Sequence, residues 1–147
     1  GLYATMLVIG LAVHVTSWLS LWSLRNVETW GVWSFLLIMT VPLVMYLYSA
    51  VAVPEDESSP NMNDYYLLNA SKMHALLIMA IGCNAFADLL LLGRPPDVAV
   101  TVVRFVVLAL MFTCAVNPAA VRLHRIILPT IALGSALLVP FMEFPIK

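Results

Sequence analysis

Charged side chains are scarce in this chain. Only 10% of its 147 residues are Asp, Glu, Lys or Arg, whereas 63% are hydrophobic, and the mean hydropathy is +0.98. Soluble proteins carry about 25% charged residues, and a soluble fold of this size leaves much of its surface in water. The scarcity of charge therefore argues against a soluble globular domain and predicts that lipid surrounds most of the protein.

Other features are also missing. The net charge of -1 lacks the basic excess that binding to phosphates requires, so no nucleic-acid partner is expected. The two cysteines, Cys83 and Cys114, lie in apolar runs and are too few for a disulfide framework, so we interpret them as small core residues. The sequence has no P-loop, no nucleophile elbow and no Gly-x-x-x-Gly motif. We therefore predict no catalytic residue and favour a protein that is not an enzyme.

Long hydrophobic runs dominate what is present. A membrane-spanning helix needs about 20 mostly apolar residues, and five runs meet this need, at 2–24, 30–53, 67–92, 98–116 and 120–141. The sequence predicts an all-α fold in which residues 1–147 form a single transmembrane bundle of about five helices. The acidic segment 54–66 is the one long hydrophilic stretch, and we expect it to lie in water as a loop.

The residues at the ends of the predicted helices do not decide which side of the membrane each end faces. Four tryptophans gather around the first turn, as in an aromatic belt at one membrane interface: Trp18, Trp22, Trp30 and Trp33. Three basic residues fall on each side of the membrane, namely Lys72, Arg122 and Arg125 on one side and Arg25, Arg94 and Lys147 on the other. The positive-inside rule therefore leaves the orientation open.

Polar residues inside the apolar runs are the first candidates for function, since they are costly in hydrocarbon. Asn84 and Asp88 are four residues apart and share a helix face. Arg104 follows the turn at 93–97 by about as many residues as Asp88 precedes it, so the two side chains lie at similar depth. They predict either a buried ion pair that fixes helix packing or part of an ion or proton pathway.

The three histidines allow several interpretations. His14 lies in the middle of the first run, whereas His74 and His124 lie near the starts of two helices on the same side of the membrane. Two histidines at one depth are compatible with haem ligation, and hydrogen-bonded or interfacial histidines are the simpler interpretation. No His, Cys or Asp spacing within one helix predicts a metal site. Arg122 and Arg125 flank His124 and favour contact with lipid headgroups.

Several short patterns are shared with one group of proteins. They comprise His14, Val15, Trp18, Trp22, Arg25 and Trp33, then Pro42, Tyr46, Leu47 and Pro54, then Asp64, Tyr65, Tyr66, Leu89, Leu90 and Gly93, and finally Leu123, His124 and Arg125. On these residues the chain resembles a tryptophan-rich group of uncharacterised bacterial multi-pass inner-membrane proteins with five to six helices. The segment 69–73 departs from that group because it is less basic and less aromatic. The resemblance implies the fold and a bacterial inner membrane, but no activity.

The functional expectation follows from these observations. We expect a membrane protein without a catalytic site that associates with itself or with other membrane subunits. One alternative is a small transporter or channel that uses Asn84, Asp88 and Arg104. The other is an electron-transfer subunit that binds haem or quinone through His14, His74 or His124. The chain begins with Gly1 rather than Met, so we also expect that the natural protein starts earlier, with one more helix upstream.

Overall fold

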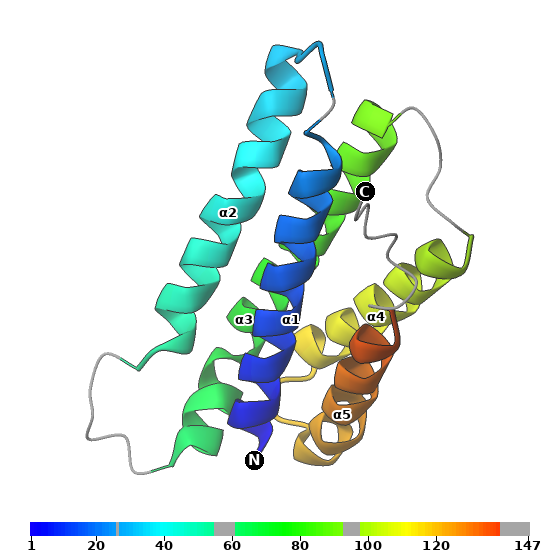
Figure 1. Cartoon of the computed structure of the whole chain (residues 1–147). Coiled ribbons are helices and arrows are strands. Elements are labelled where there is room, and N and C mark those ends of the chain that lie inside the picture. Colours follow the sequence, from blue (N-terminus) through cyan, green and yellow to red (C-terminus); the bar gives the residue numbers. More distant parts are fainter. Residues whose placement is uncertain (26, 55–60, 93–97, 139–147) are drawn as a thin grey trace.

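Five helices make up the computed structural model, which describes residues 1–25, 27–54, 61–92 and 98–138. They are α1 (Leu2–Ser23), α2 (Val32–Ala52), α3 (Met62–Leu92), α4 (Val98–Val116) and α5 (Val121–Leu138) (Figure 1). The described residues contain no strand. The predicted all-α fold, a transmembrane helical bundle, is confirmed.

Four helices, α1 to α4, are long and apolar enough to cross a membrane. Helix α5 has no such span among the described residues, and the predicted fifth run, at 120–141, continues into residues 139–147, which lie outside them. Four crossings are therefore supported by the structure, and the fifth stays a prediction. The turn at 93–97 and most of the predicted acidic loop, residues 55–60, also lie outside the described residues.

The start of α3 differs from the sequence-based expectation. The helix begins at Met62, whereas the apolar run predicts a start at Leu67 and a loop over 54–66. Asn61 explains the difference, because its backbone carbonyl accepts hydrogen bonds from the amides of Asp64 and Tyr65, and its side chain accepts one from the amide of Asn63. This arrangement satisfies the free amides of a helix start. Hydropathy alone missed the first turn because it contains the polar residues Asn63 and Asp64.

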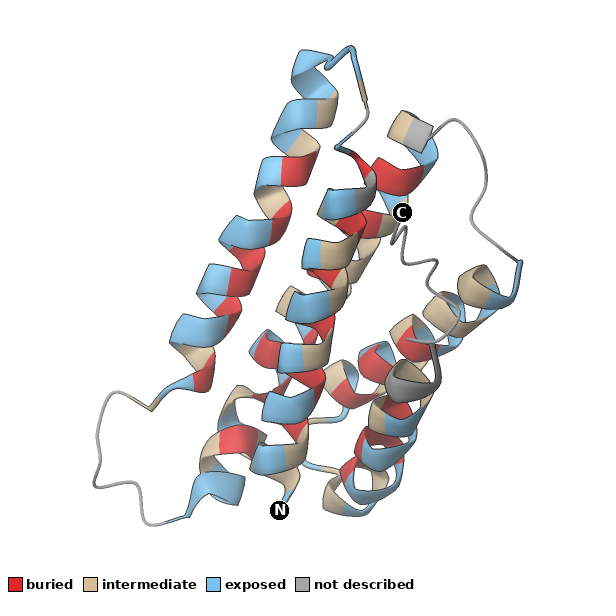
Figure 2. Ribbon diagram, in the orientation of Figure 1, coloured by how far each residue is buried: buried red, intermediate tan, exposed pale blue. Residues whose placement is uncertain are grey.

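Helix α3 is the centre of the bundle. It packs against α1, α2 and α4, while α5 packs against α1 and α4. Figure 2 shows that the buried residues follow the inward faces of the helices and that exposed residues follow the outward faces. Many outward residues are large and apolar, such as Leu68 at 84% exposure and Trp33 at 83%. Such a surface suits contact with lipid.

Tyrosine hydroxyls tie the ends of the helices together. Tyr3 donates to the carbonyl of Ala52 at 2.7 Å, and Tyr65 donates to the carbonyl of Val51 at 2.7 Å. Both carbonyls belong to the last turn of α2, where no further helical amide can reach them. Tyr48 of α2 donates to the carbonyl of Met6 on α1 at 2.9 Å. These bonds hold α2 against α1 and α3.

Tyr48 reaches α1 because Gly10 leaves room for it. A Cβ atom at Gly10 would overlap with the Tyr48 ring, which its hydroxyl bond holds in place. We therefore expect Gly10→Ala to lower the free energy of unfolding by about 1–3 kcal/mol, as overpacking typically does. Thermal unfolding in detergent would measure the change. Gly82→Ala is the matched control, because a Cβ there meets no atom within 4 Å. Equal stability of the two variants would contradict the close packing of α1 on Tyr48.

Candidate functional site

One cluster of polar side chains lies between α3, α4 and α5. It consists of Tyr66 and His74 on α3, Cys114 on α4 and His124 on α5, and we call it the histidine cluster. All four residues are fully buried, with exposures of 0%. The Tyr66 hydroxyl lies 2.9 Å from Nε2 of His74 and 2.5 Å from Nδ1 of His124. One phenol oxygen therefore links two imidazoles from two different helices.

The hydrogen bonds of the histidine cluster fix where its protons lie when both imidazoles are neutral. Nε2 of His124 lies 3.0 Å from the backbone carbonyl of Asn117, which can only accept, so Nε2 carries the proton. Nδ1 of His124 is then an acceptor, and Tyr66 donates to it. The Tyr66 oxygen in turn accepts from Nε2 of His74. With the ring proton of His74 on Nε2, its Nδ1 carries no proton and keeps a free lone pair.

That lone pair has no protein partner. Nδ1 of His74 is buried and makes no hydrogen bond within the described residues. Ligand atoms of His74, Cys114 and His124 all lie within 4.8 Å of one another. Because a buried acceptor without a donor is costly, Nδ1 of His74 is the least satisfied polar atom of the histidine cluster.

A second polar cluster lies further along α3. Asp88 accepts a hydrogen bond at 2.9 Å from Nη2 of Arg104 on α4, and the two side chains are only 11% and 17% exposed. One turn earlier on α3, Asn84 donates to the Ser17 hydroxyl of α1 at 2.7 Å. The structure thus places Asp88 and Arg104, which were matched by depth, in an ion pair, puts Asn84 one turn away on the same helix, and adds Ser17 from α1.

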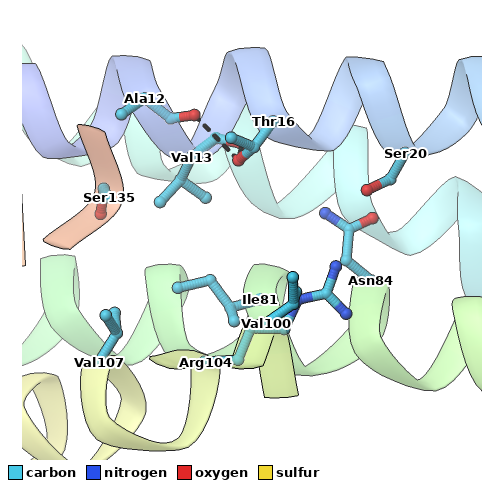
Figure 3. A pocket seen from close by; sticks show the side chains of 10 residues that line it. All are labelled: Ala12, Val13, Thr16, Ser20, Ile81, Asn84, Val100, Arg104, Val107 and Ser135. Atoms are coloured by element: carbon cyan, nitrogen blue, oxygen red, sulfur yellow. Dashed lines mark hydrogen bonds between the residues drawn. The ribbon is translucent and has the colours of Figure 1, made fainter. Parts of the chain in front are cut away.

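A pocket of about 80 Å³ opens beside this second cluster, and we call it the arginine pocket. Its walls come from α1, α3, α4 and α5, and Figure 3 shows the side chains of Arg104 and Asn84 meeting in the space below α1. Thr16 and Ser20 line the α1 side, and Ser135 lines the α5 side. The remaining lining is apolar, from Ala12, Val13, Ile81, Val100 and Val107.

Arg104 has spare binding capacity in the arginine pocket. Its Nη2 pairs with Asp88, but its Nη1 is buried and makes no hydrogen bond within the described residues. A guanidinium cannot lose its proton in a protein, so Nη1 is a permanent donor. The Thr16 hydroxyl donates to its own helix, at 2.9 Å to the carbonyl of Ala12 (Figure 3), which leaves its oxygen as an acceptor. The pocket therefore offers donors and acceptors in an apolar enclosure.

The other predicted residues lie elsewhere. His14 is exposed on α1 and accepts a hydrogen bond from Nε1 of Trp18 at 3.1 Å, so it belongs to neither cluster. Arg122 and Arg125 are exposed near the start of α5, where contact with lipid headgroups stays a prediction.

Sequence reasoning missed two members of the histidine cluster. The sequence predicts Tyr66 in the loop before α3, because the polar residues of the first turn conceal the start of that helix. The apolar run around Cys114 predicts a core residue, which fits its burial but does not indicate its histidine neighbours. The sequence predicts that His74 and His124 lie at similar depth in the membrane. Cys114 comes close to them only because of the way α4 is rotated about its axis. The spacing of residues within one helix does not predict that rotation.

The fold and these sites define a helical transmembrane protein with two buried polar clusters, one of which lines a pocket. No protein family, curated protein or solved structure matches the chain. Its function is therefore inferred from the geometry of the two clusters.

The shared hydroxyl of Tyr66 makes a testable contribution to stability. Tyr66→Phe removes a donor from His124 and an acceptor from His74, so two buried polar atoms lose their partner. We expect the free energy of unfolding to fall by about 1–3 kcal/mol, measured by thermal unfolding in detergent. Tyr46→Phe is the control, since Tyr46 is 71% exposed on α2. The role of the hydroxyl would be refuted by a Tyr66→Phe protein as stable as the control.

Proposed function

We propose that this chain is a multi-pass protein of a bacterial inner membrane and a small transporter that binds an inorganic anion in the arginine pocket. The observation that carries the proposal is the buried Nη1 of Arg104, a cationic donor without a partner on the wall of a pocket among four helices. The bacterial membrane is supported by the resemblance, and the membrane itself by the four apolar helices.

The lining of the pocket favours an anion as its ligand. Arg104 supplies a charged donor, and Asn84 and the hydroxyls of Ser20 and Ser135 supply neutral ones. Anions are bound by such donors, and charge-assisted hydrogen bonds are about twice as strong as neutral ones. The volume of about 80 Å³ limits the ligand to a small one, such as chloride or nitrate.

Asp88 suggests how the anion could be accompanied by a proton. Arg104 and Asp88 neutralise each other when the pocket is empty. A bound anion would then leave one uncompensated negative charge in a medium of low dielectric constant, which is costly. A proton on Asp88 would restore neutrality and would also free Nη2 of Arg104 to bind the anion. The proposal is therefore cotransport of an anion with a proton.

Liposomes that contain the purified protein and the pH dye pyranine would test this proposal. A chloride or nitrate gradient is expected to drive proton uptake with the natural protein, and Arg104→Gln is expected to reduce the rate at least about tenfold, because it removes the charged donor. Arg125→Gln is the matched control, since Arg125 is exposed outside the pocket. Unchanged uptake with Arg104→Gln, or no uptake with any protein, would contradict transport through this pocket.

Asp88 gives a separate readout in the same liposomes. Asp88→Asn keeps a hydrogen-bond acceptor near Arg104 but cannot carry a proton. We expect anion flux, followed with an anion-sensitive dye, to continue while proton uptake disappears. Continued proton uptake in this variant would exclude Asp88 as the proton carrier.

The other two interpretations receive less support. A haem between His74 and His124 would have to displace the Tyr66 hydroxyl that bonds both rings, whose centroids are 5.8 Å apart. Quinone binding is less favoured because His74 and His124 are both fully buried, with exposures of 0%. Association with a second copy or with other membrane subunits stays a prediction, which native mass spectrometry would test.

A further inference from the structure

We propose that the arginine pocket selects its anion by how weakly that anion holds water, so that its substrates are weakly hydrated monovalent anions such as nitrate and iodide. The inference rests on the proposed function, since it takes this pocket as the anion site, and it adds a selectivity that the charge of Arg104 alone does not give. The apolar part of the lining carries it, because most of the surface of the pocket is apolar.

The polar side chains that surround an anion gather at one end of the pocket. Figure 3 shows Arg104, Asn84 and Ser20 toward that end, whereas Val13 and Val107 lie toward the other. An anion bonded to Arg104 therefore faces apolar side chains on its far side. Apolar walls offer no hydrogen bonds in place of the water that the anion leaves behind, and such a loss is costly for a charged group.

Few hydrogen-bond donors are free at the polar end. The Thr16 hydroxyl donates to carbonyls of its own helix, and Asn84 donates one N–H to Ser17. The donors that remain are Nη1 of Arg104, the Ser20 hydroxyl and the second N–H of Asn84. Selectivity among ions depends on how well a lining replaces the water shell of the ion. An anion that holds its water tightly therefore loses more than it gains on entry.

The charge of the site limits the ligand to one negative charge. Arg104 and Asp88 neutralise each other at a distance of 2.9 Å. In the proposed cotransport, one proton on Asp88 compensates for one negative charge of the anion. A divalent anion such as sulfate would leave a second charge uncompensated among side chains that are only 17% and 11% exposed, which is costly. The pocket therefore disfavours sulfate.

Size then ranks the monovalent anions. Moving an ion from water to apolar surroundings costs more when its charge is concentrated in a small volume. Nitrate spreads its charge over several oxygens and iodide is large, whereas fluoride is small and chloride lies between them. Each hydrogen bond to water that the pocket fails to replace lowers the affinity about tenfold. We expect nitrate and iodide to bind more tightly than chloride, and fluoride and sulfate to bind most weakly.

The nuclear magnetic resonance line of chloride would test this ranking without transport. The line broadens when chloride exchanges between water and a protein site, and a competing anion narrows it again. The full chain in detergent, at mildly acidic pH so that a proton is available to Asp88, is titrated with each sodium salt. Nitrate and iodide should halve the broadening at lower concentrations than added chloride does. Fluoride and sulfate should require concentrations at least about tenfold higher than nitrate.

Two substitutions on α4 test the apolar lining as the cause. Val100 lines the pocket one turn before Arg104, so Val100→Asn places an amide donor beside the anion. We expect the preference for nitrate over fluoride to fall about tenfold, since the added hydrogen bond favours the anion that holds water more tightly. Val98→Asn is the matched control, because Val98 is 77% exposed and lies outside the pocket. Its preference should equal that of the natural protein.

The outcomes separate selectivity from transport. Equal competition by nitrate and fluoride would overturn the inference even if the liposomes show anion flux. Iodide that competes no better than fluoride would do the same, because selection would then follow the shape of the anion. Neither result depends on the folding of a variant. An unchanged preference in Val100→Asn would exclude the apolar lining as its cause.

Arg104→Gln and the flux measurements complete the test. Broadening that persists in Arg104→Gln would assign the bound chloride to another place and would contradict both proposals. The expected ranking without any flux in liposomes would support the selectivity of the pocket and refute transport.

Discussion

Three buried polar side chains of helix α3, namely Tyr66, Asn84 and Asp88, each meet a partner on another helix, and the arrangement of the bundle depends on these bonds. Lipid offers no hydrogen bonds, so a polar atom within the bundle must be satisfied by the protein. Tyr66 bonds to His124 of α5, Asn84 bonds to Ser17 of α1, and Asp88 bonds to Arg104 of α4. These partners on three different helices determine how α1, α4 and α5 are arranged around α3.

The hydrophobic effect cannot supply this specificity. Lipid tails are as apolar as leucine side chains, so apolar faces gain little by leaving lipid for one another. Many large apolar residues accordingly point outward on the described helices, and the buried positions of α3 include small or polar groups such as Ala70, Ala80 and Asn84 beside the larger Met73 and Leu77. Close packing and a few polar bonds therefore select one arrangement of helices. Loss of one bonding partner leaves the other as a buried polar group without a hydrogen bond.

Much of the fold could be predicted from the sequence, because a bilayer imposes length and hydropathy on each crossing. The ends of α4 match the apolar run at 98–116, and the matched depth of Asp88 and Arg104 follows from the turn between their helices. The start of α3 was wrong, because Asn61 begins the helix with polar residues. Rotation of each helix about its axis is set by contacts such as that of Tyr48 with Gly10, and a single sequence does not record them.

The two polar clusters are separate sites rather than parts of one pathway. A proton relay along α3 would need a polar group at each step between His74 and Asn84, a distance of roughly 15 Å. The fully buried residues of α3 in that interval are Leu77 and Ala80, and neither can carry a proton. The histidine cluster is also closed on all sides, whereas the second cluster adjoins a pocket. The enclosed histidine cluster joins α3 to α5 through its hydrogen bonds, whereas a pocket with a spare cationic donor suits a solute that enters and leaves. Helix α3 thus carries the histidine cluster and the second polar cluster as separate sites, because the apolar residues between them keep them apart.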